Sequence, residues 1–199
     1  MRNNENQNDT SNILAMKERI NDFFENKKFA RITRQVSEIS FEISRGYIVD
    51  FSNDFIVIIE TDDFNLLGYS ILSIKDIKEI RYNNHDRYYD KIMKWENKKE
   101  EIKLKTKICL KNYKSIFETF QANNSNIIIY CENPKINSFT IGAIKQITAK
   151  SIYILYFDAN GFWDEEPTQI NFSNITKISF DDRYIDVFSK YTRKRKNNE

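Results

Sequence analysis

The sequence has few of the residues on which catalytic and metal sites are usually built. Its 199 residues include 4 Gly, 2 Pro, 2 Cys and 1 His. Loops that hold phosphate groups need clustered glycines, because their backbone must approach the phosphate closely, so such a site is not expected. Cys109 and Cys131 are too few for a disulfide framework or a zinc site, and we expect both to be buried, inert thiols. We therefore predict no metal and no cofactor.

An excess of one charge and long apolar runs are missing as well. Lys and Arg number 31 and Asp and Glu 29, which gives a net charge of +2. No strong field therefore directs the chain to nucleic acid or to an anionic membrane. The longest apolar runs, such as residues 55–59, fall far short of the roughly 18 residues that indicate a membrane span. The polar N-terminus lacks the apolar segment of a signal peptide, so we predict a cytoplasmic protein without a membrane partner.

What the chain does contain is abundant apolar residues and a motif that occurs twice. Apolar residues make up 40% of the sequence and aromatic residues 14%, as in a globular domain. The motif around Asp86 recurs around Asp182, an offset of 182 − 86 = 96 residues, which indicates a duplicated unit. The repeated residues are Asp86, Arg87, Tyr88, Asp90 and Lys94 in the first copy and Asp182, Arg183, Tyr184, Asp186 and Lys190 in the second.

Hydrophobic periodicity predicts the same elements in both copies. Residues 13–23 repeat apolar side chains at helical spacing, and the positions 97 residues later are apolar too. Short stretches with strand-like alternation follow. Gly46 interrupts the long second strand, and Gly142 stands 142 − 46 = 96 residues later. Both copies are therefore expected to bend this strand at a glycine.

The predicted fold is mostly β with helices (α+β): two tandem five-stranded barrels, each with a leading and a closing helix. On the closing helix, Arg87 and Asp90 are expected to form an ion pair. The charged segment after this helix fits either a connector or a solvated extension of the helix. The predicted divisions are a disordered tail (1–10), a first repeat (11–96), a charged connector (97–107), a second repeat (108–191) and a basic tail (192–199).

This order of elements resembles the Sm-like small barrel. Residues 46–57 look like that family's bent strand, turn and third strand, and residues 75–80 occupy the place of its last strand. SH3-like barrels fit the strand count nearly as well. RNA-binding Sm-like proteins carry an Asp and an Asn in the turn after the bent strand and an Arg-Gly pair near the last strand. Because Ser52 takes the first of these positions and no Arg-Gly pair lies near Ile77 or Ile175, the resemblance implies the fold and not the RNA pocket.

Phe162 and Trp163 are the candidate binding residues. They lie in a predicted loop beside Asp164 and Glu165. Large aromatic side chains in a loop either plug a barrel end or the interface between copies, or anchor a partner. The single histidine, His85, has no nucleophile near it in the sequence, so we predict no catalytic residues and no enzyme.

These features favour a non-enzymatic binding module whose partner is an unidentified protein. An immunity or inhibitor protein is a subclass of this interpretation. The alternative is binding of RNA or of another single-stranded nucleic acid, which the Sm-like resemblance and the basic tail favour and the balanced charge opposes. The sequence does not predict the oligomeric state.

Overall fold

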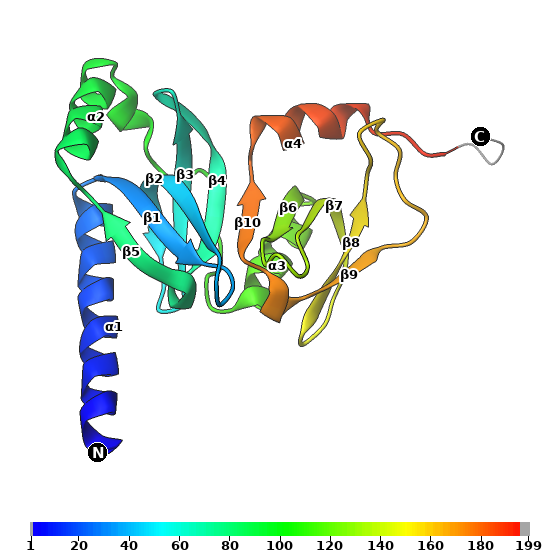
Figure 1. The fold of residues 1–199 in the computed structure, drawn as a ribbon. Helices are drawn as coiled ribbons and strands as arrows, with labels where there is room; N and C mark the ends of the chain where they lie inside the picture. The colour runs from blue at the N-terminus through cyan, green and yellow to red at the C-terminus, as the bar shows by residue number, and fades with distance from the viewer. Residues whose placement is uncertain (1, 196–199) are drawn as a thin grey trace.

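A computed structural model describes residues 2–195, with side chains from Ile13 onward, as an α+β chain built on one antiparallel sheet (Figure 1). The first half contains α1 (Arg2–Glu25), β1 (Phe29–Gln35), β2 (Phe41–Phe51), β3 (Phe55–Asp62), β4 (Asn65–Ser73), β5 (Ile77–Arg81) and α2 (Asn84–Trp95). The second contains α3 (Tyr113–Ala122), β6 (Asn126–Cys131), β7 (Ser138–Ile147), β8 (Ser151–Tyr156), β9 (Thr168–Asn171), β10 (Lys177–Phe180) and α4 (Arg183–Phe188).

The ten strands form a single sheet in the order β5-β1-β2-β3-β4-β10-β6-β7-β8-β9. The predicted α+β class is confirmed. Two separate closed barrels are not found in residues 2–195, because the sheet stays open, with β5 and β9 as its outer strands. An edge strand exposes unpaired backbone groups. Here the edge strands β4 and β10 pair with each other in an antiparallel arrangement. The prediction was therefore wrong in treating the halves as separate sheets.

Each half follows the same strand order, β5-β1-β2-β3-β4 and β10-β6-β7-β8-β9. The register of the bent strand shifts between Ile48 and Asp50 in β2 and between Ile144 and Gln146 in β7, again 144 − 48 = 96 residues apart. A short 3-10 helix precedes the last strand of each half, at Ile74–Asp76 and at Phe172–Asn174. The two β-bulges thus stand at the same place in each half.

Gly46 and Gly142 permit close contact between neighbouring strands. A Cβ atom on Gly46 would lie 2.1 Å from the Ile59 carbonyl oxygen, and one on Gly142 would lie 1.9 Å from that of Leu155. Both distances are far below van der Waals contact, so no larger residue fits without moving the backbone. The predicted equivalence of the two glycines is consistent with this geometry.

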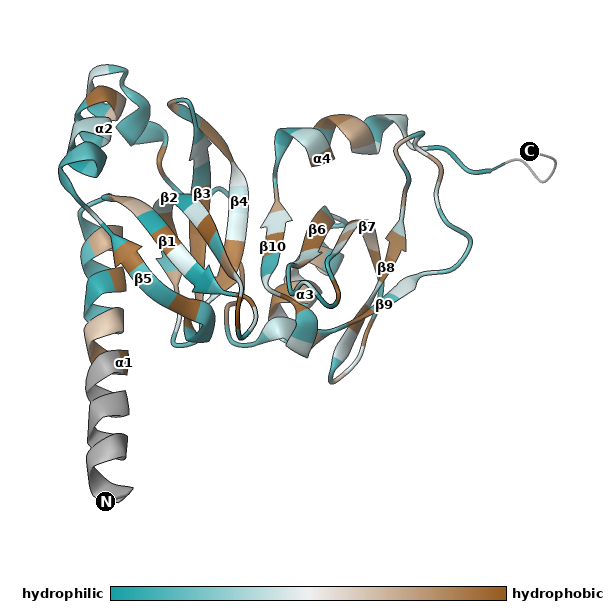
Figure 2. Cartoon of the chain, in the orientation of Figure 1, coloured by the Kyte–Doolittle hydropathy of each residue, from teal (hydrophilic) through white to brown (hydrophobic). Residues whose placement is uncertain are grey.

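The leading helices pack on the bent strands. Ile20 and Phe23 of α1 are buried in one core cluster, and Phe117 and Phe120 of α3 are buried in another. Brown, hydrophobic residues accordingly concentrate on the strands in Figure 2. The leading helix, predicted from the spacing of residues 13–23, begins at Arg2, so it includes most of the predicted disordered tail 1–10.

The cores of the two halves lie on opposite faces of the sheet at the joint, the pairing of β4 with β10. Successive strand residues point to opposite faces. Leu72 belongs to the first core, whereas its neighbour Ile71 faces the second core together with its cross-strand partner Ile178. Tyr69 stacks on Phe180 one step further along, at 5.1 Å between ring centroids. The outer face of the first half therefore forms one wall of the second core.

A buried ion pair also crosses between the halves. Arg34, only 1% exposed, donates to both carboxylate oxygens of Glu132, at 2.7 and 3.0 Å. Its remaining donors reach the Ser44 hydroxyl and the Thr176 carbonyl oxygen, and the Thr176 hydroxyl donates to Glu132. Burial alone would raise the pKa of Glu132, but Arg34 and Thr176 outweigh it and hold this pKa below its ordinary value. Arg34 thus makes four hydrogen bonds, two of them to Glu132, as a buried guanidinium requires.

The predicted charged connector is partly buried. A 3-10 helix spans Lys98–Glu101, and the chain then places Ile102 and Ile108 in the large core cluster. After α2 the chain forms this short 3-10 helix and not a continued α-helix, and the segment joins α2 to α3. None of the helices in the described part of the chain combines the length and the apolar character needed to cross a membrane.

Candidate functional site

The predicted binding residues Phe162 and Trp163 are partly exposed in the loop between β8 and β9. Trp163 packs edge-on against the buried Phe157, with 5.2 Å between ring centroids. The Arg193 guanidinium lies over the Phe162 ring, 4.1 Å from its centroid, and that of Arg195 lies at 5.6 Å. Both aromatic side chains therefore contact other parts of the same half.

The predicted basic tail runs alongside this loop as far as it is described, to Arg195. The Arg193 N–H donates to the Gly161 carbonyl oxygen at 2.7 Å, and the Trp163 N–H donates to the Arg193 carbonyl oxygen at 3.1 Å. Arg195 also forms an ion pair with Asp158 at 3.2 Å. The aromatic loop and the tail, which are distant in sequence, thus meet in space. Lys196, counted in the predicted tail, lies outside the described residues.

The predicted ion pair between Arg87 and Asp90 is not formed. Asp90 instead accepts hydrogen bonds from the Tyr47 and Tyr82 hydroxyls, at 2.8 and 2.9 Å, and forms an ion pair with Lys99. Arg87 donates to Asn84 and lies over the Tyr82 ring. The prediction was wrong because Tyr47 of β2 and Tyr82, which directly follows β5, present hydroxyl groups to α2, and spacing along a helix does not reveal such partners.

Burial shifts the pKa values of the two tyrosines and of Lys99. Burial, followed by the neighbouring Asp90, raises the pKa of Tyr47 well above its ordinary value and that of Tyr82 to about 12. Burial lowers the pKa of the Lys99 ammonium group, although Asp90 opposes the change. Asp90 and Lys99 are partly buried, with side chains 13% and 19% exposed.

The structure does not bring His85 and the two cysteines together at one site. His85 is exposed in the first turn of α2. Cys131 is buried, and burial raises the pKa of its thiol, whereas Cys109 is exposed, contrary to the prediction that both are core thiols. Among the described residues, no group of three His, Cys, Asp or Glu side chains is placed to hold a metal ion.

The most distinctive site is a pocket of about 270 Å³ at the joint, which we call the joint pocket. Strands from both halves and the start of α4 form it. In Figure 1, β10 lies beside β4 and leads into α4. Its rim includes Phe139, 46% exposed, and Tyr184, 50% exposed. The lining residues are Glu60, Gly68, Tyr69, Ile128, Tyr130, Phe139, Ser179, Asp182 and Tyr184.

Gly68 lets the two halves approach at this pocket. A Cβ atom at this position would lie 2.6 Å from the Cα atom of Asp182 and 2.8 Å from its backbone nitrogen. Asp182 is also the N-cap of α4, because its carboxylate accepts a hydrogen bond from the Tyr184 N–H at 2.7 Å. The side chain that begins α4 is therefore positioned by direct contact with β4 of the other half.

The joint pocket combines aromatic rings with carboxylates. The Lys177 ammonium lies 4.2 Å from the centroid of the Tyr130 ring and 3.5 Å from the Glu60 carboxylate. Burial raises the pKa of Tyr130 to about 12, and the charges of Glu60 and Asp182 contribute in the same direction. Both carboxylates therefore act on one aromatic ring.

Sequence reasoning missed this pocket because its residues come from strands that no local pattern pairs. The one signal was that Tyr184 and Asp182 belong to the repeated motif. Comparisons with protein-family models, with curated proteins and with solved structures found no match for the chain.

Proposed function

We propose that the chain is a duplication of one Sm-like or SH3-like unit and acts as a non-enzymatic module that binds a protein partner at the joint pocket. The duplication is supported by the shared strand order, by bulges 96 residues apart and by the matched glycines Gly46 and Gly142. Under this proposal, the pairing of β4 with β10 joins the two copies in one sheet.

The observation that carries the binding proposal is the exposed aromatic rim of the joint pocket. Phe139 and Tyr184 are about half exposed around a cavity that both halves build. Tyr, Trp and Phe are enriched in protein interfaces, where they fill pockets in the partner or line them. A partner that covers this rim would touch both halves at once.

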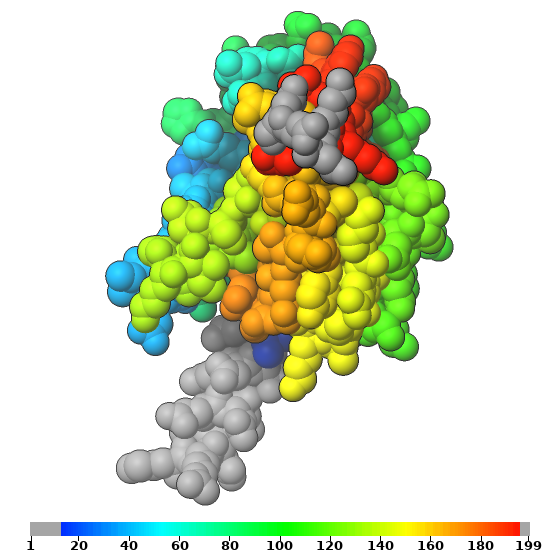
Figure 3. Space-filling model, turned by 90° about the vertical axis from the view of Figure 1, so that its right-hand side faces the viewer, coloured from blue at the N-terminus to red at the C-terminus, as the bar shows by residue number. Residues whose placement is uncertain are grey.

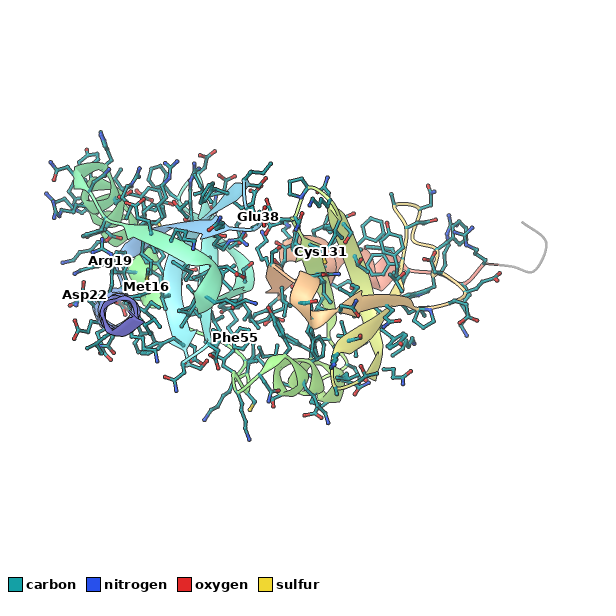
Figure 4. The ribbon with its side chains drawn as sticks, turned by 60° about the horizontal axis from the view of Figure 1, so that its bottom comes forward. Met16, Arg19, Asp22, Glu38, Phe55 and Cys131 are labelled. Carbon is teal, nitrogen blue, oxygen red and sulfur yellow. The ribbon has the colours of Figure 1, made fainter. Side chains whose placement is uncertain are left out.

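Two neighbouring hairpins extend the exposed apolar surface. Ile39, 87% exposed, lies in the β1–β2 hairpin, and Ile136, 42% exposed, lies in the β6–β7 hairpin. The tips of both hairpins line a second pocket of about 250 Å³, and Figures 3 and 4 show the hairpins side by side, with Glu38 at the tip of the first. Such exposed apolar side chains favour a protein partner.

A protein partner is favoured over nucleic acid by the charge at the joint pocket. Glu60 and Asp182 line it, and carboxylates repel phosphate groups. The arginines of the tail lie on the Phe162 ring, away from this pocket.

A capture experiment with matched variants tests the proposal. Full-length protein carrying an affinity tag is incubated with extract of the cells that produce it, beside a Phe139→Ala/Tyr184→Ala variant. The control is Tyr88→Ala/Trp95→Ala, which removes two aromatic side chains of α2 that are 58% and 64% exposed. We expect one protein to be captured stoichiometrically by the wild type and the control and to be lost from the Phe139/Tyr184 variant.

Equal capture by both variants would contradict a binding role for the joint pocket. A parallel column of single-stranded RNA tests the alternative, because retention that falls steeply as salt rises is the signature of phosphate binding. Thermal melting of each variant confirms beforehand that the fold is kept.

A further inference from the structure

We infer that the joint pocket receives a cationic side chain, lysine or arginine, of the partner. This inference rests on the proposed function and specifies the chemistry of its site. The residues that line the pocket include two carboxylates, Glu60 and Asp182, and no Lys or Arg. The rings of Tyr130, Phe139 and Tyr184 complete a wall of the kind that attracts ammonium and guanidinium groups.

The protein already holds a cation of its own against this wall. The ammonium of Lys177, whose side chain is 16% exposed, contacts the Tyr130 ring and the Glu60 carboxylate. In the first half, Lys99 lies 4.3 Å from the centroid of the Tyr47 ring and pairs with Asp90. A ring beside a carboxylate is thus the arrangement by which this chain binds ammonium groups twice.

Lys177 leaves part of the negative charge unmatched. It pairs with Glu60, whereas Asp182 takes part in none of the ion pairs found in the described part of the chain. The carboxylate of Asp182 accepts only the capping hydrogen bond from Tyr184 among the hydrogen bonds of the described residues. A second cation that enters the pocket would meet this carboxylate and the exposed faces of Tyr184 and Phe139.

The size of the pocket suits a single side chain. Sites for drug-sized molecules occupy roughly 300–1,000 Å³. The joint pocket, at about 270 Å³, falls just below this range. Anionic groups are disfavoured by the two carboxylates, and a neutral apolar group would leave Asp182 without a counter-charge.

The test uses small mimics of the two side chains, so that it does not depend on knowing the partner. The full-length, 15N-labelled protein is titrated with n-butylammonium or n-butylguanidinium at constant ionic strength, with n-butanol and butyrate as neutral and anionic controls. We expect saturable shifts of the Gly68, Tyr130 and Ser179 amide signals with the cations alone. Saturation by butanol or butyrate with equal affinity would overturn the inference, as would the absence of saturation by both cations.

Variants that each remove one carboxylate test whether the cations bind at the joint pocket. Asp182→Asn removes the charge and keeps the cap, because Asn caps helices about as well as Asp. We expect it to weaken cation binding by about two- to fivefold, the effect of losing one partly exposed charge pair. Asp186→Asn, which removes an exposed charge from the same helix, is the matched control and should leave the affinity unchanged. Equal weakening by both variants would show a diffuse field and not a site.

The two proposals fail in different ways. If the cations bind but no protein is captured through Phe139 and Tyr184, the chemistry of the pocket stands and the proposed function falls. If a protein is captured through these residues but the cations do not saturate the pocket, the function stands and the inference falls.

Discussion

In the first half, one partly buried carboxylate fastens the closing helix α2 to the strands; in the second, aromatic packing fastens α4. Asp90 gathers the Tyr47 and Tyr82 hydroxyls and the Lys99 ammonium. The equivalent Asp186 is exposed, and position 143, which corresponds to Tyr47, holds alanine. In the second half Phe188 of α4 stacks on Phe157, with 5.4 Å between ring centroids.

The pairing of the strands and the attachment of the closing helix therefore depend on different contacts. Strand order, bulges and glycines match between the halves, because backbone pairing restricts each of them. The inner face of a short helix needs only a partner of some kind, polar and satisfied or apolar and packed. At the N-terminal end of α4, Asp182 and Tyr184 contribute to the joint pocket.

The largest effect is expected where the halves are joined. Glu132→Gln leaves the buried Arg34 guanidinium without its counter-charge, and we expect a loss of about 3–5 kcal/mol in the free energy of unfolding, measured by urea denaturation. The control is Glu118→Gln, which breaks the exposed pair with Lys114 and should cost less than about 1 kcal/mol. Similar losses in both variants would show that the cross-link does not unite the halves.

The equivalence of the halves is tested by the two glycines. Gly46→Ala and Gly142→Ala force a Cβ atom against the neighbouring strand, and each should cost about 1–3 kcal/mol or more. Because the geometry is alike, the two losses should agree within experimental error in urea denaturation. Glu42→Ala, at an exposed position in β2, serves as control. Strongly unequal losses would contradict the structural equivalence of the two glycines.

The difference between the halves is tested by the two aspartates. Asp90→Asn removes the charge that pairs with Lys99, and we expect it to lower the free energy of unfolding by about 1–2 kcal/mol. Asp186→Asn changes an exposed carboxylate and should stay within about 0.5 kcal/mol of the wild type. Calorimetry or urea denaturation of both variants measures the contrast, which would disappear if the closing helices were fastened alike.

A smaller effect should appear at high pH. The folded protein holds the pKa of Tyr82 at about 12, above the ordinary value of 10, so between these pH values the unfolded chain loses this proton and the folded chain keeps it. Stability that Tyr82 contributes is therefore fully present below pH 10 and lost as the pH rises toward 12. Tyr82→Phe should make the decline in this window less steep in urea melts. An unchanged slope would contradict the role of the hydroxyl.

Much of the frame could be predicted from local patterns. The offset of 96 residues, the helical spacing of Ile20 and Phe23 and the paired glycines all correspond to features of the structure. Each depends on residues close in sequence, because burial of one face imposes a period of about 3.6 or 2. The candidate site was not predicted in this way, since Glu60, Tyr130 and Asp182 meet only after β4 pairs with β10.

By itself, then, the amino-acid sequence determined that two similar sets of short elements occur, and where each bends. Tertiary structure alone decided that the sets share one sheet, that Asp90 binds hydroxyls and not Arg87, and that Cys109 is exposed. The physical reason is that the backbone N–H and C=O groups at a strand edge are nearly the same for every residue, so the sequence of the strand does not specify which strand it pairs with. Their partner is chosen by the packing of both cores, which involves side chains more than 100 residues apart, such as Ser70 and Ser179.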